Sequence, residues 1–490
     1  MADVTLLGID VGTTGVRAAA FGEDGRLLAD AAEAVPYDAA PGRAEVDVEG
    51  WWTAVRAACA RVGERAPLSA VQAVGVTGQA PTAVLVDDGG RPLRRAILWL
   101  DTRADEAARA LEATLGPGRA EAIGGNRMHA YFLGPKLAWL RAHEPRVFDR
   151  AALVLQSHAF VAMRLTGEAA CDPSTAMLCA PLFDAAALAW SEEGARAAGV
   201  PVRLLPRIAR AHEVVGAVTR AAAEATGLRE GTPVVAGGGD FAASALGAGV
   251  VEEGQACLML GTAGNLLVPT DRPRFDARLI NSHHVGCDRW LSLGGTLCGA
   301  ALEWFRRACA PGAEWDELEA EAAAVEVGAS GLVVLPYLQG ERTPVWDEHA
   351  RGAFHGLDLT HGRGHLLRAM IEGVALGFRD CLLVAEQQGV RFGEVVAANG
   401  AGRSRLLRQT LADALGLPLV WTPRGGATVT GAAILAALGA RVIGEARDAR
   451  GWGAHGTVAA ERHEPDPRAH ARLSEVFERR RALYRAVRGV

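Results

Sequence analysis

A short pattern occurs twice in the chain, and it constrains the fold more than any other feature of the sequence. Residues Val4 to Asp10 read as a buried strand, and they lead through the tight turn Gly12-Thr13-Thr14-Gly15 into a second strand. About half a chain later, the strand Ala256 to Leu260 leads into Gly261-Thr262-Ala263-Gly264. The 490 residues also exceed roughly 250–300 residues, where a single core stops growing. Two similar α/β domains are therefore expected.

Further elements fit this organisation. An amphipathic helix is expected from about Gly50 to Val62, and a buried strand from Val71 to Val76 that ends at Thr77-Gly78-Gln79. In the second half, the strand Val395 to Ala398 ends in a comparable glycine-rich turn. The segment 247–254 is rich in glycine, so we expect one domain over residues 1–246 and another over 247–490.

Composition excludes several classes of function. The net charge is -6, so no basic excess is available to neutralise the phosphates of a nucleic acid. The N-terminus lacks the pattern of a signal peptide, and no apolar stretch is long enough to cross a membrane, which predicts a cytoplasmic location. No two of the eight cysteines have CxxC spacing, so they are expected to be reduced, mostly buried thiols rather than zinc ligands.

Lysine is almost absent, and this restricts how a nucleotide could be held. Lys136 is the only lysine, and it follows Pro135 rather than the glycine of a Walker A loop. A P-loop site is therefore excluded. If the protein uses ATP, backbone amides and a metal ion must hold the phosphates.

The first turn has the residues for such a site. Gly12 and Gly15 permit backbone conformations in which successive N–H groups converge on an anion, and Thr13 and Thr14 add hydroxyl donors. Asp10, at the end of the strand, could bind Mg²⁺ directly or through water. A plain hairpin is the alternative, but the repeat at Gly261-Thr262 favours the phosphate site.

A second acidic residue follows another strand. Asp240 comes directly after three glycines, Gly237 to Gly239, which let the backbone approach a ligand closely. A carboxylate at the carboxyl end of a strand can accept the proton of a sugar hydroxyl as that hydroxyl attacks phosphorus. Asp240 could also simply cap the helix expected from Phe241 to Leu246.

Two other stretches remain ambiguous on their residues alone. The run Asn399 to Ser404 could let an adenine ring lie against the backbone, but its residues alone favour a routine turn between strand and helix with Ser404 as the N-cap. Asp101 and Arg103 alternate in an extended run after Trp99, so they could bind a polyol or form a surface ion pair.

Taken together and in order, the motifs resemble the FGGY carbohydrate kinases, most closely the xylulokinases. The resemblance covers nearly the whole chain to about Gly439. It rests on the segments Gly8 to Val16, Ala96 to Trp99, Pro135 to Leu140, Arg164 to Glu168, Val235 to Asp240, Leu260 to Thr262, Leu335 to Pro344, Gly400 to Arg403 and Arg408 to Asp413.

The resemblance implies a fold, a reaction and a set of roles. The fold would be α/β, with duplicated ribonuclease-H-like, actin-type ATPase domains and a cleft between them. ATP and Mg²⁺ would be the cofactors, and Asp240 would be the catalytic base. Asp10 would organise the metal and the phosphates. The phosphate chain would contact Gly12, Thr13, Thr14, Gly261 and Thr262, and the adenosine would contact Gly400, Ala401, Gly402 and Arg403.

Three departures from the family pattern fall where the sugar should bind. The usual Gly-Gln-Met-His-Gly is Gly78-Gln79-Ala80-Pro81-Thr82, the usual Asn after the base is Phe241, and the usual Trp-Asn-Asp-Gly-Arg is Trp99-Leu100-Asp101-Thr102-Arg103. The expected substrate-binding residues are Gln79, Ala80, Pro81, Asp101, Arg103, Asp240 and Phe241.

The substrate is therefore less well determined than the reaction. The expected partner is a small sugar or polyol, and neither a nucleic acid nor a membrane; a homodimer is possible. Kinases of ribulose, erythritol or glycerol, an actin-like ATPase without a sugar substrate, and a non-catalytic sugar sensor are the alternatives.

Overall fold

The computed structural model describes residues 5–398, 400–421, 426–452 and 460–489. The chain divides into two compact units, which we describe separately. Unit 1 is formed by residues up to 251, by 281–291 and by 426–456, and unit 2 by the segments 252–280, 292–425 and 457–490. The chain first passes from unit 1 to unit 2 after Val251, and each unit is discontinuous in sequence.

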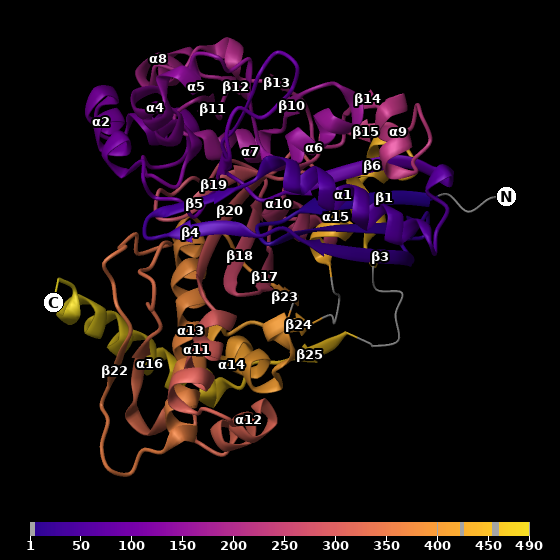
Figure 1. Cartoon of the computed structure of the whole chain (residues 1–490). Helices are drawn as coiled ribbons and strands as arrows, with labels where there is room; N and C mark the ends of the chain where they lie inside the picture. Colours follow the sequence, from indigo (N-terminus) through magenta and orange to yellow (C-terminus); the bar gives the residue numbers. More distant parts are fainter. Residues whose placement is uncertain (1–4, 399, 422–425, 453–459, 490) are drawn as a thin grey trace. The chain divides into compact units, whose positions relative to one another are not determined.

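Unit 1 is built on a seven-stranded sheet (Figure 1). The first strand, β1 (Thr5–Val11), pairs antiparallel with β2 (Gly15–Gly22) and parallel with β6 (Val71–Gly78). The strand order is β14-β15-β6-β1-β2-β3, and β16 also pairs with β6. The remaining strands of this sheet are β3 (Leu27–Ala34), β14 (Val214–Ala217), β15 (Pro233–Val235) and β16 (Gly238–Gly239).

Helices and short strands complete unit 1. The helices are α1 (Val48–Gly63), α2 (Asp105–Leu115), α3 (Arg119–Gly124), α4 (Leu133–His143), α5 (Pro145–Phe148), α6 (Ser157–Thr166), α7 (Pro173–Ala176), α8 (Glu192–Ala198), α9 (Arg220–Thr226), α10 (Asp240–Gly247) and α15 (Ala427–Gly439). The short strands are β4 (Tyr37–Ala40), β5 (Arg43–Val46), β7 (Val84–Val86), β8 (Ala96–Ile97), β9 (Leu153–Leu155), β10 (Ala170–Cys171), β11 (Phe183–Asp184), β12 (Ala189–Trp190) and β13 (Arg207–Ile208).

Helix α15 belongs to unit 1 although it comes late in the chain. It packs against β1, β6 and α10, and glycines permit the close approach. A Cβ placed on Gly75 of β6 would lie only 1.9 Å from the carbonyl oxygen of Ala432 in α15. The helix is therefore fitted to this face of the sheet, and any side chain at Gly75 would push it away.

Unit 2 repeats the strand arrangement of unit 1. Strand β17 (Gln255–Leu260) pairs antiparallel with β18 (Ala263–Thr270) and parallel with β23 (Glu394–Ala398), as β1 pairs with β2 and β6. The full order is β19-β20-β18-β17-β23-β24-β25, where β19 is Ile280–His283, β20 Trp290–Leu297, β24 Leu419–Trp421 and β25 Glu461–His463. The duplicated α/β organisation expected from the two glycine-threonine turns is confirmed.

Five helices and a hairpin accompany this sheet. They are α11 (Gly299–Cys309), α12 (Trp315–Ala323), α13 (Arg363–Gln387), α14 (Arg405–Leu415), α16 (Pro467–Val487), and the pair β21 (Val333–Leu335) and β22 (Ala353–His355). A core of buried aliphatic and aromatic side chains joins the sheet to α11, α13, α14 and α16. None of the helices in the described part of the chain has the length and apolar character of a membrane span.

Candidate active site

Three strand ends in unit 1 bring the two expected acidic residues to one edge of the sheet. Asp10 of β1 lies opposite Thr77 of β6, and Gly238 of β16 lies opposite the same Thr77. Helix α10 starts with Asp240 directly after β16. Because β1, β6 and β16 run parallel, their carboxyl ends meet, and such an edge is where α/β sheets bind ligands.

Burial disfavours ionisation of both carboxyl groups, and repulsion by Asp240 adds to this effect at Asp10. Burial raises the pKa of Asp10 to about 8; the charge of Asp240 adds to this, and Arg17 and Thr77 oppose it. Burial also raises the pKa of Asp240 to about 6, against a hydrogen bond from the Phe241 N–H. The two residues therefore form an electrostatically coupled acidic pair, of which Asp240 ionises first on raising the pH.

The loop before Asp240 has little freedom. Gly237 has φ +76°, and a Cβ there would lie 1.7 Å from the carbonyl oxygen of Val76, so only glycine fits. The Ser174 hydroxyl accepts a hydrogen bond of 3.1 Å from the Gly239 N–H. Oδ1 of Asp240 accepts from the adjacent Phe241 N–H at 2.7 Å. Asp240 is thus the first residue of α10 rather than its N-cap, which is Gly239.

The Gly12–Gly15 turn is closed by a hydrogen bond of 2.9 Å from the Gly12 N–H to the Gly15 carbonyl. Thr14 is exposed, and Thr13 is partly exposed. The indole N–H of Trp99 donates to the Thr13 hydroxyl at 3.0 Å. The structure therefore connects Trp99 to the Gly12–Gly15 turn, and sequence reasoning did not foresee this link because 85 residues lie between Thr13 and Trp99.

The altered Gln79-Ala80-Pro81 segment lies in the interior of unit 1. Ala80 is only 6% exposed, as is fitting for an apolar lining, and Phe241 is 8% exposed. The Tyr131 hydroxyl donates to the Ala80 carbonyl at 3.4 Å. The amide of Gln79 is buried, and neither its nitrogen nor its oxygen has a hydrogen-bond partner among the described residues. Gln79 thus retains unused donors and an acceptor.

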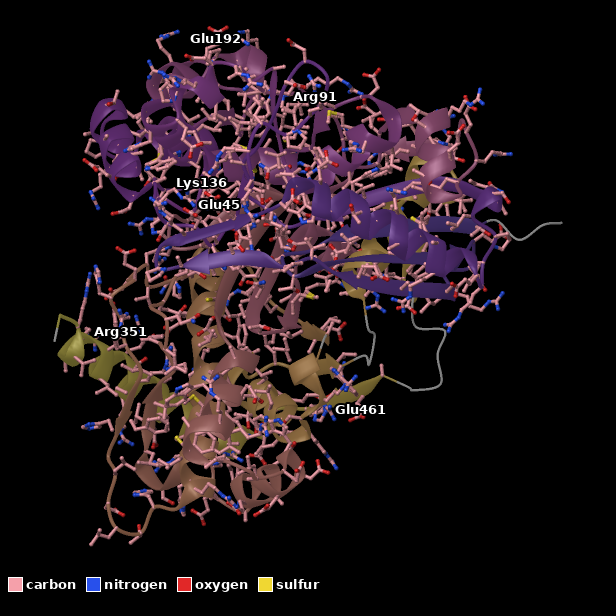
Figure 2. All side chains as sticks on the ribbon, in the orientation of Figure 1. Glu45, Arg91, Lys136, Glu192, Arg351 and Glu461 are labelled. Atoms are coloured by element: carbon pink, nitrogen blue, oxygen red, sulfur yellow. The ribbon has the colours of Figure 1, made fainter. Side chains whose placement is uncertain are left out.

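Asp101 and Arg103 bind each other. Asp101 is fully buried, and its Oδ2 accepts from the Arg103 Nη2 at 2.6 Å and from the Ala44 N–H at 2.7 Å. Arg103 also pairs with Glu45 at 2.6 Å, which contributes to lowering the pKa of Glu45. The polar atoms of the two residues are thus occupied within this network. Glu45 is labelled in Figure 2.

The single lysine supports the same region. The Nζ of Lys136 donates to the carbonyl oxygens of Leu98, Trp99 and Tyr131 at 2.8, 3.2 and 3.0 Å. Its side chain is fully buried, and burial lowers its pKa to about 7. Lys136, also labelled in Figure 2, therefore holds the backbone near Trp99 and Tyr131 in place. Nothing in these contacts resembles a phosphate-binding lysine.

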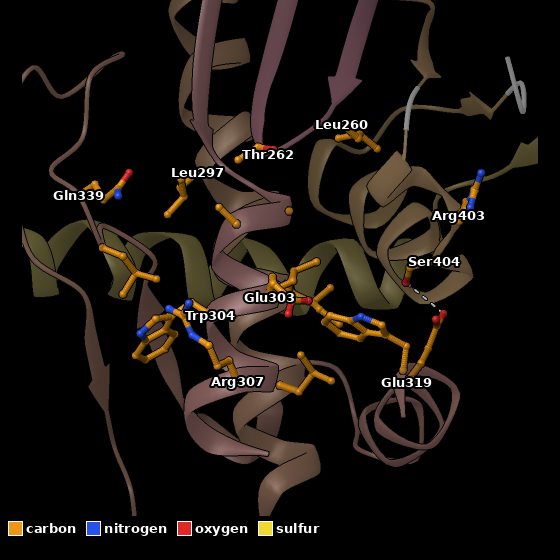
Figure 3. A pocket seen from close by; sticks show the side chains of 18 of the residues that line it. Leu260, Thr262, Leu297, Glu303, Trp304, Arg307, Glu319, Gln339, Arg403 and Ser404 are labelled. Atoms are coloured by element: carbon orange, nitrogen blue, oxygen red, sulfur yellow. Dashed lines mark hydrogen bonds between the residues drawn. The ribbon is translucent and has the colours of Figure 1, made fainter. Parts of the chain in front are cut away.

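Unit 2 contains a cavity of about 1070 Å³ beside its own glycine-threonine turn (Figure 3). The backbone of Gly261 and Thr262 is fixed by hydrogen bonds to the start of α11, from the Gly299 N–H at 2.9 Å and the Ala300 N–H at 3.0 Å. Among the expected nucleotide residues, Gly261, Thr262 and Arg403 line the cavity. Further polar and aromatic lining residues are Glu303, Trp304, Arg307, Trp315, Glu319 and Ser404.

The turn after β23 closes one side of this cavity. Residues Gly400–Arg403 form a short 3₁₀ helix, although Asn399 and the side chain of Ala401 lie outside the described residues. The Nη1 of Arg408 donates to the carbonyl oxygens of Gly402 and Arg403 at 2.7 and 3.0 Å. The Ser404 hydroxyl caps α14, as expected, and donates to Glu319 at 3.0 Å.

Sequence reasoning missed the aromatic residues of this cavity. Trp315 opens α12 and is 39% exposed, and the guanidinium of Arg306 lies 6.0 Å from the centre of its ring. A tryptophan at the start of a helix gives no sequence signal of its own. Only the cavity itself, which Trp315 lines together with charged residues, marks this ring as a candidate contact for a ligand.

The described residues contain no group of three or more histidine, cysteine, aspartate or glutamate side chains that could hold a metal ion. All eight cysteines are free thiols, mostly buried, as expected. Asp10 still fits a magnesium ion, because Mg²⁺ commonly takes only one or two carboxylates and completes its shell with substrate phosphates and water. A cation there would also offset the repulsion that raises the pKa of Asp10.

Comparison with known proteins identifies the relatives of this chain. Residues 5–247 match the N-terminal domain of the FGGY family of carbohydrate kinases, and residues 256–440 match its C-terminal domain. A xylulose kinase from Escherichia coli K12 is 35% identical over 441 residues, covering 89% of this chain and 90% of the relative. The crystal structure of a xylulose kinase from Rhodospirillum rubrum has a TM-score of 0.89 and 33% identity, covering 99% of both chains. A gluconokinase from Bacillus subtilis is 26% identical, covering 83% of this chain and 82% of the relative.

Proposed function

Because the chain belongs to the FGGY family of carbohydrate kinases, we propose that it transfers the γ-phosphoryl group of ATP to a hydroxyl group of a small ketose or polyol. The family assignment makes the chain a phosphotransferase with an alcohol acceptor. The main observation behind the choice of catalytic base is the pair of buried carboxyl groups at the strand ends. Within this pair, the pKa of Asp240 is raised only to about 6.

Asp240 is suited to be the base. A general base works best when its pKa lies near the operating pH, because it is then ionised and still accepts a proton readily. As the acceptor oxygen forms its bond to the γ-phosphorus, the bond from that phosphorus to the β,γ-bridging oxygen breaks and ADP leaves. The proton of the acceptor hydroxyl passes to Asp240. Ser174 and Gly237 hold the loop that presents this carboxylate.

The remaining residues have binding roles in this proposal. The Gly12–Thr14 turn of unit 1 and the Gly261–Thr262 turn of unit 2 would contact the phosphates through backbone N–H and hydroxyl groups. Asp10 would hold Mg²⁺, which when bound neutralises charge on the phosphates. Asp101 and Arg103 act as supports of the Trp99 segment, since their polar atoms are already paired.

The cavity of unit 2 is proposed to receive the adenosine. Its volume of about 1070 Å³ is at the upper end of the range for small-molecule sites, roughly 300–1,000 Å³. Trp315 offers an exposed ring on which a base can stack, and Arg403, at the end of the 3₁₀ helix, also lines the cavity.

We predict that Trp315→Ala weakens ATP binding roughly tenfold, because stacking of a base on an aromatic ring contributes about 1–3 kcal/mol. Isothermal titration calorimetry with Mg·ATP measures the change. Trp315→Phe is the matched control and should retain most of the affinity. Equal affinity of Trp315→Ala and wild type would place the adenine elsewhere.

The acceptor site is proposed to prefer a substrate other than D-xylulose. Ala80, Pro81 and Phe241 stand where the xylulokinase pattern has methionine, histidine and asparagine, and none of their side chains can bind a hydroxyl group. A buried hydroxyl without a partner costs roughly 1–3 kcal/mol, or about 5- to 150-fold in specificity. Within the Gln79-Ala80-Pro81 segment, the side chain of Gln79 is polar, and its buried amide has no partner among the described residues. This amide could bind a hydroxyl group of the substrate.

The experiment is a coupled assay of kcat/KM for D-xylulose, D-ribulose, L-ribulose, erythritol, glycerol and D-gluconate. We predict that one of the other acceptors exceeds D-xylulose by at least about fivefold. The double variant Ala80→Met/Pro81→His, which restores the family residues, should raise the relative rate with D-xylulose. A clear optimum for D-xylulose in the wild type would contradict the proposed preference.

A further inference from the structure

A second cavity in unit 2, of about 240 Å³, lies apart from the nucleotide cavity, and no residue lines both. Helix α16 contributes Arg480, Arg481, Tyr484 and Arg485, and helix α13 contributes Asp380, Leu383, Val384 and Gln387. The wall is completed by Arg278, Tyr337, Pro344 and Val345. We call this the arginine cavity.

Positive charge dominates the lining, which has four arginines and a single carboxylate. Two of the arginines have close anionic partners: Arg480 is paired with Asp380, and Arg278 is bound by Asp276 at 2.7 Å. Arg481 reaches only 3.8 Å from Asp380 and 3.8 Å from Glu478. It is therefore only weakly compensated.

Arg485 has no acidic partner at all among the described residues. Its side chain takes part in no ion pair or hydrogen bond there, and it is exposed at the cavity. Two further acidic side chains lie near this end of α16. Asp347 accepts from the Tyr484 hydroxyl at 2.7 Å and faces Arg488 at 3.9 Å, and the buried Glu341 accepts from the Thr296 hydroxyl at 2.7 Å. Net positive charge thus remains at the mouth of the cavity.

The inner wall supplies a buried donor. Arg480 is only 2% exposed, and its Nη2 donates to the Tyr337 hydroxyl at 2.8 Å. Its Nε has no hydrogen-bond partner among the described residues. Leaving a charged donor buried without an acceptor is costly. The ion pair between Arg480 and Asp380 explains how α16 is held to α13. It leaves the Nε–H of Arg480, and the guanidinium groups of Arg481 and Arg485, available to a ligand.

We propose that the arginine cavity binds a small organic anion with two or more negative charges, such as a phosphate monoester or a polycarboxylate. Its oxygens would pair with Arg481 and Arg485 and accept from the Nε of Arg480, since guanidinium groups bind both kinds of anion in a bidentate manner. The apolar side chains of Val345, Leu383 and Val384 suit a carbon skeleton. The volume is below the roughly 300 Å³ of ordinary ligand pockets, which excludes large ligands.

The test is isothermal titration calorimetry of the full chain with pyrophosphate and, separately, citrate, in a magnesium-free buffer of low ionic strength. At least one probe is expected to bind the wild type. The double variant Arg481→Gln/Arg485→Gln is expected to bind it at least about tenfold more weakly. Arg472→Gln, which removes an arginine of α16 paired with Glu475 outside the cavity, should bind like the wild type.

The two probes and the variants together show where the binding heat in the calorimetric titration comes from. Binding of pyrophosphate alone supports a phosphate ester as the natural ligand, and binding of citrate alone supports a carboxylate. Binding that is unchanged in the double variant belongs to the phosphate turns of the kinase site and overturns the proposal, as does failure of both probes to bind. Because Arg480 is untouched, the double variant should keep the wild-type thermal midpoint without ligand.

Discussion

Asp240→Asn is expected to lower kcat by about 10²–10⁴-fold, the usual contribution of a positioned base. The substitution keeps the shape of the side chain and leaves Ser174 and Gly237 in place, so the loop should not change. ATP affinity, measured by calorimetry, is expected to stay close to wild type. Asp88→Asn, in the exposed turn after β7, is the matched control and should retain full activity.

The pH dependence gives a second measurement on the same residue. Only the ionised carboxylate accepts a proton, and the pKa of Asp240 is about 6. The wild-type kcat/KM is therefore expected to fall as the pH is lowered through about 6, and the residual activity of Asp240→Asn should lack this step. Near-wild-type turnover in the variant would refute the assignment of the base.

Asp10→Asn is expected to weaken the binding of Mg·ATP by at least about tenfold, in the range found when groups that support a metal are removed. Lys136→Met is the control, because the Nζ of Lys136 donates its hydrogen bonds to backbone carbonyls of unit 1, and the substitution should not affect nucleotide affinity. Loss of binding in Lys136→Met together with normal binding in Asp10→Asn would show that the phosphate site is wrong.

Protonation of Asp10 provides an independent signature. Its pKa is about 8 in the metal-free protein, so at pH 7 the carboxyl group is mostly protonated and must lose its proton when the metal and nucleotide bind. Calorimetry in buffers of different ionisation enthalpy should reveal proton release in the wild type and less release in Asp10→Asn.

The raised pKa of Asp10 also predicts how the free energy of unfolding depends on pH. A carboxyl group whose pKa is raised in the folded state stabilises that state fully only below its unfolded pKa, and the contribution is lost as the pH rises toward the folded pKa. For Asp10 this window runs from 3.8 to about 8. Ligand-free Asp10→Asn should therefore have a higher free energy of unfolding than the wild type at pH 8, measured by urea denaturation.

Local sequence patterns predicted the parts of the molecule that local chemistry determines. The hairpins at Gly12–Gly15 and Gly261–Gly264 follow from turn residues between apolar runs, and their repetition predicted two similar α/β domains. The helix from Gly50 to Val62 was predicted within two residues of the observed α1. The position of Asp10 and Asp240 at one sheet edge follows because parallel strands present their carboxyl ends together.

Features that depend on distant contacts could not be predicted. Helix α15 joins unit 1 because Gly75 and its neighbours allow close packing, and nothing near residue 430 indicates which sheet it will meet. The spacing of Asp101 and Arg103 fitted either a ligand or a mutual pair, and only the contacts with Ala44 and Glu45 distinguish the two. The exposure of Trp315 likewise depends on its neighbours in space.

The central claim is phosphoryl transfer from ATP to an alcohol, and ³¹P NMR of the complete reaction tests it most directly. The purified protein is incubated with Mg·ATP, with and without each acceptor of the panel. The account predicts that ADP and one phosphate monoester form in equal amounts with an acceptor, and that little inorganic phosphate forms without one. Conversion of ATP to ADP and inorganic phosphate at the same rate with and without every acceptor would contradict it and indicate an ATPase that has no sugar substrate.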